Sequence, residues 1–141
     1  MHRLAPIIIV DDDPDDQEMI KEVCSILKIK NMLLWFDNGR QVLDYLQKTT
    51  EQPFLILCDV NMPLMDGLEL RKIINNDEVL RNKAIPFVFL STSANRQQVN
   101  YAYKMTVQGF FEKGHDFENL KKKIELIFEY WKECKHPNSF Q

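Results

Sequence analysis

The chain has 141 residues, which is enough for one domain with its own hydrophobic core but not for two. Its 18 Lys and Arg residues against 21 Asp and Glu residues give a formal net charge of -3, which argues against direct binding of nucleic acid or of an anionic membrane. No apolar run approaches the roughly 20 residues that span a bilayer, and the three cysteines lack metal-site spacing, so a cytoplasmic protein with reduced cysteines is predicted.

The first predicted strand, residues 7–10, is wholly apolar and runs directly into a series of aspartates. Asp13 followed by Pro14 is typical of an N-cap and the first position of a helix. Asp15 and Asp16 would then lie in the first turn, where the helix dipole favours acidic side chains. The helix gives Asp13 a structural role and leaves the acids before it without one.

The next two strands are predicted at residues 32–36 and 54–58, with a short helix between them that ends near Lys48. The run at 54–58 does not alternate with polar residues, as expected for a strand covered on both faces of a parallel sheet. It ends abruptly on Asp59, so this carboxylate is expected at the carboxyl edge of the sheet, where open α/β folds bind ligands.

The connection after Asp59 is predicted to be irregular, because Pro63 has no backbone N–H and Gly67 tolerates backbone angles that are closed to other residues. A third helix is expected to begin only after Gly67. Residues 75–83 are charged and polar and are interpreted as a connection without readable structure.

The second half of the chain predicts two more buried strands and two more helices. In chain order these are a strand at 87–90 that stops on Ser91, a weak helix near 99–105, a strand at 109–111 that leads to Lys113, and a long helix at 117–131 capped by Asp116. Strand and helix alternate five times, which predicts an α/β fold with a doubly wound, five-stranded parallel sheet and helices on both faces. We expect one domain over residues 1–141, with a core of about 6–134, loose ends at 1–5 and 136–141, and no output domain.

Five polar residues follow strand ends that such a fold brings to one edge: Asp11, Asp12, Asp59, Ser91 and Lys113. Carboxylates about 4 Å apart repel by roughly 4 kcal/mol per pair at an effective dielectric near 20, so a positive charge must compensate. Oxygen ligands without His or Cys indicate Mg²⁺. Lys113 and Ser91 supply the donors that would hold a phosphoryl group, and Asp59 would be the nucleophile that forms an acyl phosphate.

Four separated segments carry a resemblance to a known family: IIIVDDDP, LILCDVNMPLMDGLEL, PFVFLSTS and GFFEK. Over nearly all of its length the chain resembles a response-regulator receiver domain, the phosphoacceptor half of a bacterial two-component pair. The resemblance implies a flavodoxin-like sheet with strand order 2-1-3-4-5. The chain is also similar to single-domain regulators that are associated with phytochrome-type kinases.

The resemblance implies a metal site and a phosphoacceptor. Asp59 corresponds to the phosphoacceptor, and Asp12 and Asp59 to direct ligands of Mg²⁺, for which Mn²⁺ can substitute. Asp11 would act largely through water, and the backbone carbonyl of Asn61 would be a further ligand.

The resemblance also implies a switch. Ser91 corresponds to the switch hydroxyl, Lys113 to the phosphoryl contact, and Phe110 to the aromatic switch position, here without the hydroxyl of the Tyr often found there. The chain departs from the family at Gly114, where Pro is common, and this leaves the geometry of the loop after Lys113 open.

The implied function is that of a phosphorylation-controlled binding module rather than an enzyme that turns over a metabolite. Its partners would be a histidine kinase or phosphotransfer protein and an unknown downstream protein. The helix near 99–105, the fifth strand and the last helix are the surface expected for output and for a homodimer. A Mg²⁺-dependent phosphatase with an Asp nucleophile is an alternative, although such enzymes usually have an acid where this chain has Asn61. A flavodoxin-like cofactor binder is a third, although 4 glycines provide no convincing phosphate loop.

Overall fold

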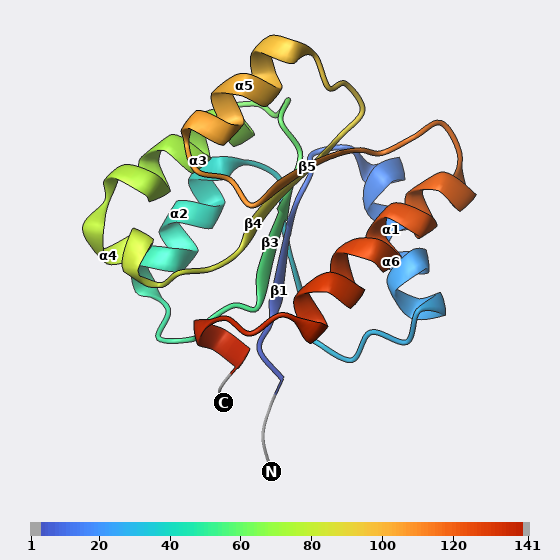
Figure 1. The fold of residues 1–141 in the computed structure, drawn as a ribbon, viewed down its shortest axis with the longest axis horizontal. Helices are drawn as coiled ribbons and strands as arrows, with labels where there is room; N and C mark the ends of the chain where they lie inside the picture. Colours follow the sequence, from blue (N-terminus) through green and yellow to red (C-terminus); the bar gives the residue numbers. More distant parts are fainter. Residues whose placement is uncertain (1–3, 140–141) are drawn as a thin grey trace.

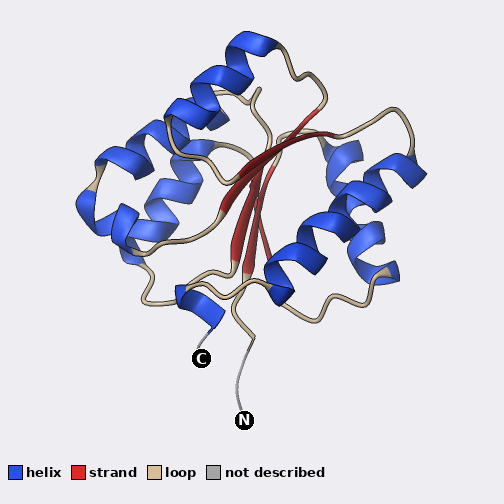
Figure 2. Ribbon diagram, in the orientation of Figure 1, coloured by secondary structure: helices blue, strands red, loops and turns tan. Residues whose placement is uncertain are grey.

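The computed structural model describes residues 4–139, in which strands and helices follow one another along the chain (Figures 1 and 2). In chain order the elements are β1 (Ile7–Val10), α1 (Pro14–Ile26), β2 (Leu33–Phe36), α2 (Gly39–Lys48), β3 (Leu55–Cys58), α3 (Gly67–Asn76), α4 (Glu78–Asn82), β4 (Phe87–Ser91), α5 (Arg96–Lys104), β5 (Gly109–Glu112), α6 (Phe117–Glu133) and the 3₁₀ turn η1 (Pro137–Ser139). Within this range no helix combines the length and the apolar character that crossing a membrane requires.

The strands form one parallel sheet in the order β2-β1-β3-β4-β5, so the predicted fold and strand order are confirmed. Helices α2, α3, α4 and α5 cover one face, and α1 and α6 cover the other (Figure 1). All the strand ends that precede a helix therefore reach the same edge of the sheet. This arrangement places the aspartates that follow β1 and β3 side by side.

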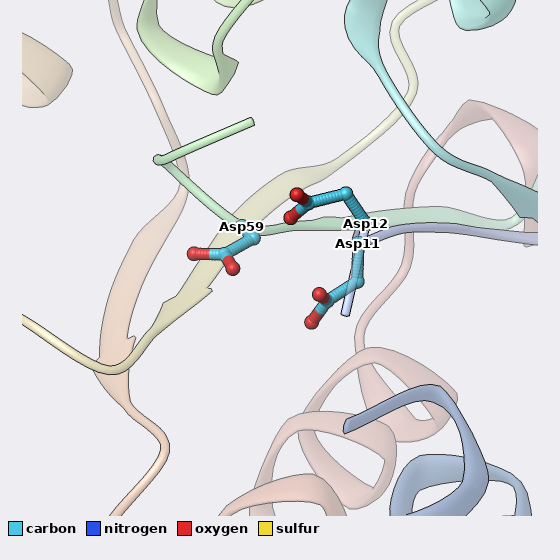
Figure 3. A group of neighbouring side chains, drawn as sticks. All are labelled: Asp11, Asp12 and Asp59. Atoms are coloured by element: carbon cyan, nitrogen blue, oxygen red, sulfur yellow. The ribbon is translucent and has the colours of Figure 1, made fainter. Parts of the chain in front are cut away.

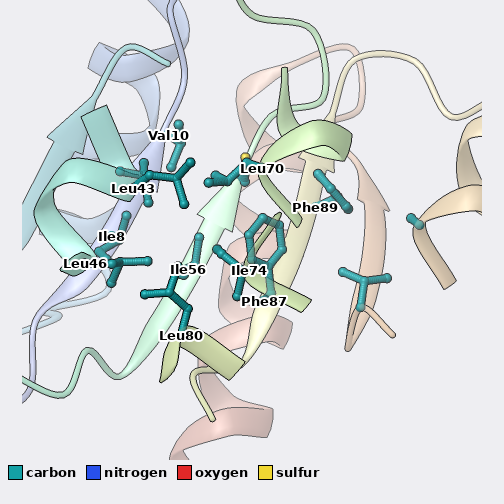
Figure 4. Close-up of a cluster of buried hydrophobic side chains, with 14 of the residues drawn as sticks. Ile8, Val10, Leu43, Leu46, Ile56, Leu70, Ile74, Leu80, Phe87 and Phe89 are labelled. Carbon is teal, nitrogen blue, oxygen red and sulfur yellow. The ribbon is translucent and has the colours of Figure 1, made fainter. Parts of the chain in front are cut away.

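Successive side chains of each strand enter two different cores, which explains why the strands contain no polar alternation. In β1, Ile8 and Val10 join the core beneath α2, α3 and α4, whereas Ile7 and Ile9 join the core beneath α1 and α6. Figure 4 shows the first core, in which Phe87 and other strand residues meet leucines of the covering helices. Burial of each large side chain contributes about 1.5–3 kcal/mol before the entropy of ordering the chain, so both faces hold the sheet rigid beneath the site.

The helices begin where short polar side chains can cap them. The predicted cap at Asp13 is confirmed, since its carboxylate accepts hydrogen bonds from the backbone N–H groups of Asp15 and Asp16. Asp116 caps α6 in the same way through the N–H of Asn119. The helix predicted near 99–105 is α5, which begins earlier, after the cap Asn95.

Residues 75–83, interpreted from the sequence as a polar connection without readable structure, contain the short helix α4. Asp77 caps this helix by accepting a hydrogen bond from the Leu80 N–H, and Leu80 is buried against the core. A helix of five residues places only one such side chain in the core, so it leaves no apolar periodicity to detect.

The prediction of a loose end after residue 135 was wrong for the described part of that segment. His136 is buried, with its ring centroid 5.1 Å from that of Phe54 and 5.7 Å from that of Trp131. The Asn138 side chain is buried as well and donates a 2.7 Å hydrogen bond to the carbonyl of Pro53. The segment therefore packs against the amino edge of the sheet. Residues 1–3 and 140–141 of the two predicted loose ends lie outside the described residues.

Candidate functional site

Three carboxylates meet at the carboxyl edge of the sheet, as predicted. Asp11 and Asp12 follow β1 and Asp59 follows β3, and one carboxylate oxygen of each lies within 4.8 Å of the others (Figure 3). Asp11 and Asp59 are only 2% and 8% exposed, whereas Asp12 is open to solvent. Hard oxygen donors at this spacing suit a divalent metal ion, and the exposed Asp12 provides the side from which an ion can enter.

Lys113 supplies the positive charge that these carboxylates need. It follows β5, and its Nζ donates to Asp11 Oδ2 at 2.6 Å and to Asp59 Oδ2 at 3.2 Å. A third bond of 2.7 Å goes to Asp16 Oδ2. The Lys113 side chain is 5% exposed, so little solvent screens this network.

Burial and charge oppose each other in the network. Burial raises the pKa of Asp11 to about 6, although the Lys113 ammonium beside it pulls the value down. Burial would lower the pKa of Lys113, but Asp11 and Asp59 outweigh it and hold that pKa above its ordinary value. Lys113 therefore stays charged. Keeping the buried Asp11 carboxylate ionised costs free energy, and a further positive charge nearby would reduce that cost.

The backbone around Asp59 holds its carboxylate in place. The Asp59 N–H donates to the carbonyl of Val10 at 2.9 Å, which ties β3 to β1, and Asp59 Oδ1 accepts a 2.7 Å bond from the Val60 N–H. The Cys58 thiol donates to the Asp59 carbonyl at 3.0 Å. Because Oδ1 faces the backbone and Oδ2 faces Lys113, the two oxygens are in different environments.

Gly67 is required at this site, but not for the predicted reason. Gly114 is the glycine of the described chain with a positive φ, so Gly67 uses no backbone angle closed to other residues. A Cβ at Gly67 would instead lie 2.2 Å from the Asp59 carbonyl oxygen and 2.7 Å from the Phe89 ring. The unusual angle belongs to Leu64, whose φ is 65° and whose flanking residues form a hydrogen bond from the Met65 N–H to the carbonyl of Pro63.

Ser91 and Phe110 belong to the neighbouring strands β4 and β5. Ser91 is fully buried at the end of β4, its carbonyl accepts a 2.8 Å bond from the Lys113 N–H, and its hydroxyl accepts from the Ser93 N–H at 3.4 Å. Phe110 is half-buried, with its ring centroid 5.4 Å from that of Phe89. Asn61 is exposed two residues beyond Asp59. The functional roles of Ser91, Phe110 and Asn61 remain predictions.

The loop after Lys113 has its own backbone. Gly114 has a φ of 84°, which proline cannot adopt because its ring holds φ near -65°. A Cβ at Gly114 would also lie 2.6 Å from the Cβ of Asn119. The loop after Lys113 therefore has a backbone that requires glycine at position 114 and excludes the proline common in the family.

Asp16 also belongs to this site, although its place in the sequence did not predict it. Its position in the first turn of α1 predicts only a favourable interaction with the helix dipole, yet its carboxylate reaches Lys113. One signal was available: side chains in the first turn of a helix lean toward its N-terminus, and α1 begins at the carboxyl edge of the sheet.

The comparisons with known proteins agree with this geometry. Residues 7–125 match the family model of the response regulator receiver domain. The chain belongs to this family. This receiver domain is thus the phosphoacceptor module of a two-component regulator and not a classical enzyme, and the phosphatase alternative is not supported. Receiver domains are phosphorylated by histidine kinases and act on downstream targets.

Several relatives cover most of this receiver domain. It is 33% identical over 129 residues to a probable methanogenesis regulatory protein, FilR2, of Methanothrix harundinacea, a match that covers 89% of this chain and 82% of that protein. It is 31% identical over 132 residues to the response regulator Rcp1 of a Synechocystis strain, covering 90% of this chain and 88% of Rcp1.

Solved structures extend the likeness to regulators of the phytochrome type. The phosphorylated cyanobacterial phytochrome response regulator RcpA superposes with a TM-score of 0.86 at 27% identity, covering 95% of this chain and 99% of that one. The Mn²⁺-bound form of Rcp1 superposes with a TM-score of 0.81 at 28% identity, covering 94% and 97%.

Proposed function

We propose that this receiver domain accepts a phosphoryl group on Asp59 from a histidine kinase or phosphotransfer protein in a Mg²⁺-dependent reaction. The observation that carries the proposal is the cluster of Asp11, Asp12 and Asp59, with oxygens within 4.8 Å of one another and with Lys113 against two of them. Such a set has one nucleophile, ligands for one metal ion and one fixed cation.

The proposed metal ligands are Asp11, through water, Asp12, Asp59 and the backbone carbonyl of Asn61, with Mn²⁺ as a substitute. When bound, Mg²⁺ would supply positive charge that offsets the repulsion among the carboxylates and toward an incoming phosphoryl group. The raised pKa of Asp11 is consistent with a site that gains from such charge.

The chain's own residues would carry out the transfer. A carboxylate oxygen of Asp59 attacks phosphorus and forms the O–P bond of an acyl phosphate, while the P–N bond of the donor phosphohistidine breaks. The electron pair of that bond stays on the histidine, whose ring leaves neutral when its other nitrogen carries a proton. Lys113 then donates to a phosphoryl oxygen, and Asp59 needs no proton transfer because it reacts as the anion.

Signalling would pass from Ser91 to Phe110. The Ser91 hydroxyl would turn to donate to the phosphoryl group, and Phe110, which already packs against Phe89, would move into the space beside β4. Full burial of a half-buried ring is worth about 1 kcal/mol or more, enough to bias a two-state surface. That surface would comprise α5, β5 and α6 and would bind a downstream protein or a second copy of the chain.

We further propose that residues 1–141 work as a single receiver domain in the cytoplasm. On this view self-phosphorylation and self-dephosphorylation are the reactions that the chain supports, and its output is a changed binding surface.

The deciding experiment uses acetyl phosphate, Mg²⁺ and intact-mass spectrometry. The wild-type chain should gain the mass of one phosphoryl group, and Asp59→Asn, which is close in shape but a poor nucleophile, should gain none. Asp66→Asn is the matched control, because Asp66 caps α3 in the same connection and should leave phosphorylation intact. Equal gains in wild type and Asp59→Asn would contradict the assignment, as would no gain in wild type.

A further inference from the structure

We propose that Asp16 is a positioning residue. It would keep the Lys113 ammonium in place when a divalent metal ion binds at the carboxylate cluster and competes with Lys113 for Asp11 and Asp59. The inference deepens the proposed function, since it concerns the loading of the same site. It concerns a residue of α1 outside the cluster of Asp11, Asp12 and Asp59 that would bind the metal.

The geometry gives Lys113 three carboxylate partners of two kinds. Asp11 and Asp59, at 2.6 Å and 3.2 Å from Nζ, belong to the carboxylate cluster in which the metal would bind. Asp16, at 2.7 Å, does not. An ammonium group has three hydrogens to donate, so this arrangement uses its full capacity.

Asp16 is held in position to do this. Its backbone N–H donates to the cap residue Asp13 at 3.4 Å, which fixes the first turn of α1 at the carboxyl edge. Its side chain is 16% exposed, compared with 5% for Lys113, so the ion pair is largely shielded from water. A shielded pair of this kind retains more of its attraction than a surface pair.

Metal binding at the carboxylate cluster would weaken two of the three contacts of Lys113. A metal ion that binds Asp59 directly and Asp11 through water competes with Lys113 for their oxygens and repels the ammonium. A buried ammonium that lost both partners would be left uncompensated, and uncompensated buried charges are strongly unfavourable. With Asp16 present, Lys113 keeps one anionic partner throughout, so metal binding costs less.

Asp15 provides a matched control. It lies one residue earlier, in the same first turn and with the same charge, but it is exposed and Lys113 donates to Asp16 instead. Asp15→Asn and Asp16→Asn therefore change the net charge and the interaction with the helix dipole alike. They differ in the contact with Lys113.

The test measures Mg²⁺ affinity by titration calorimetry on the whole chain, with thermal denaturation to show that each variant is folded. Asp16→Asn should weaken Mg²⁺ binding about 10-fold, the low end of the effect of removing a group that orients a metal site. Asp15→Asn should change it less than about 2-fold, a weak long-range charge effect. Asp16→Glu, which keeps the charge, should recover part of the loss. If Asp16→Asn does not fold, the Mg²⁺ affinity of Asp16→Glu is compared with that of the wild type instead.

A second measurement separates positioning from a general structural role. In a Lys113→Met background, Asp16→Asn should have no larger effect on Mg²⁺ affinity than Asp15→Asn, because the contact is already gone. Phosphorylation of Asp16→Asn by acetyl phosphate should be slow at limiting Mg²⁺ and within about 2-fold of wild type at saturating Mg²⁺, because a 10-fold weaker metal site is still filled there.

The inference is overturned if Asp16→Asn and Asp15→Asn weaken Mg²⁺ binding equally, or if the Asp16→Asn effect persists without Lys113. The affinity measurements need no phosphorylation. If the wild-type chain binds Mg²⁺ as described but takes no phosphoryl group, the proposed function fails while the role of Asp16 stands.

Discussion

At the carboxyl edge of the sheet Lys113 lies among three carboxylates, whereas at the amino edge the ring of His136 packs between those of Phe54 and Trp131. Both regions are buried and both are closed by residues distant in the sequence. The first concentrates unfavourable charge that a metal ion can relieve, and the second is held by packing and by the hydrogen bond of Asn138. This fold therefore keeps its electrostatically unfavourable region at one edge of the sheet and its packed, stabilising region at the other.

The largest effect should come from removing the cation of the carboxyl edge. Lys113→Met leaves Asp11 and Asp59 buried without their partner, which should lower the free energy of unfolding by about 3–5 kcal/mol at neutral pH without metal. Urea denaturation measures the change, and added Mg²⁺ should restore part of the stability. Lys122→Met, at an exposed position of α6, is the control and should have little effect. Equal urea midpoints for Lys113→Met and Lys122→Met would show that the Lys113 charge does not stabilise the carboxyl edge.

Gly67→Ala should disturb the same edge by steric means. The new methyl group would lie 2.2 Å from the Asp59 carbonyl oxygen, so the backbone beneath the carboxylate must shift. We expect a loss of about 3 kcal/mol and a lower phosphorylation rate with acetyl phosphate. Gly109→Ala is the control, because the nearest atom to its Cβ is 3.4 Å away. Similar losses in the two variants would show that the close approach at Gly67 is not special.

The two edges should respond to pH in opposite directions. The pKa of Asp11 is raised from 3.8 to about 6 in the folded protein, so its contribution to stability is present below about pH 4 and lost as the pH rises through 6, by up to about 3 kcal/mol. Burial lowers the pKa of His136 from 6.5, so its contribution is present above pH 6.5 and lost as the pH falls.

Urea denaturation from pH 4 to 8 in the presence of a chelator measures both trends. Asp11→Asn should abolish the first and leave the second, and His136→Phe should do the reverse. If either variant altered both trends, the two edges would be coupled rather than separate.

The smallest effect is expected at Leu64, in the exposed connection beside Asp59. Its φ of 65° is unfavourable for a branched side chain, and the side chain is 87% exposed, so it contributes little packing in return. Leu64→Gly should raise the free energy of unfolding by about 0.5–1 kcal/mol, since the greater freedom of unfolded glycine offsets part of the gain. Leu126→Gly, at an exposed position within α6, should lower it by about 1 kcal/mol. A loss of stability in Leu64→Gly would show that the turn needs leucine.

Much of the candidate site could be predicted because it follows strand ends. Asp11 and Asp59 stand directly after apolar runs, and Lys113 directly follows the strand that ends at Glu112. In a parallel sheet such positions converge at one edge. The cluster of carboxylates and the contact of Lys113 with it needed no further information than that. The motifs then pointed to the family.

Two segments could not be predicted, for a different reason. Helix α4 buries one side chain, and the segment after α6 is held by His136 and Asn138, which are polar residues in a polar stretch. Neither segment produces a periodic pattern, because each buries only one or two side chains.

The sequence by itself determined the layers of this protein and the edge at which its chemistry lies, because hydrophobic period and strand ends are local properties that survive any detail of packing. Only the tertiary structure decided that Asp16 reaches Lys113, 97 residues away, and that Gly67 makes room for the Asp59 carbonyl. Both depend on distances of a few ångströms between separate segments. Such distances are set by how all the side chains of the two cores fill space together, and no local pattern records them.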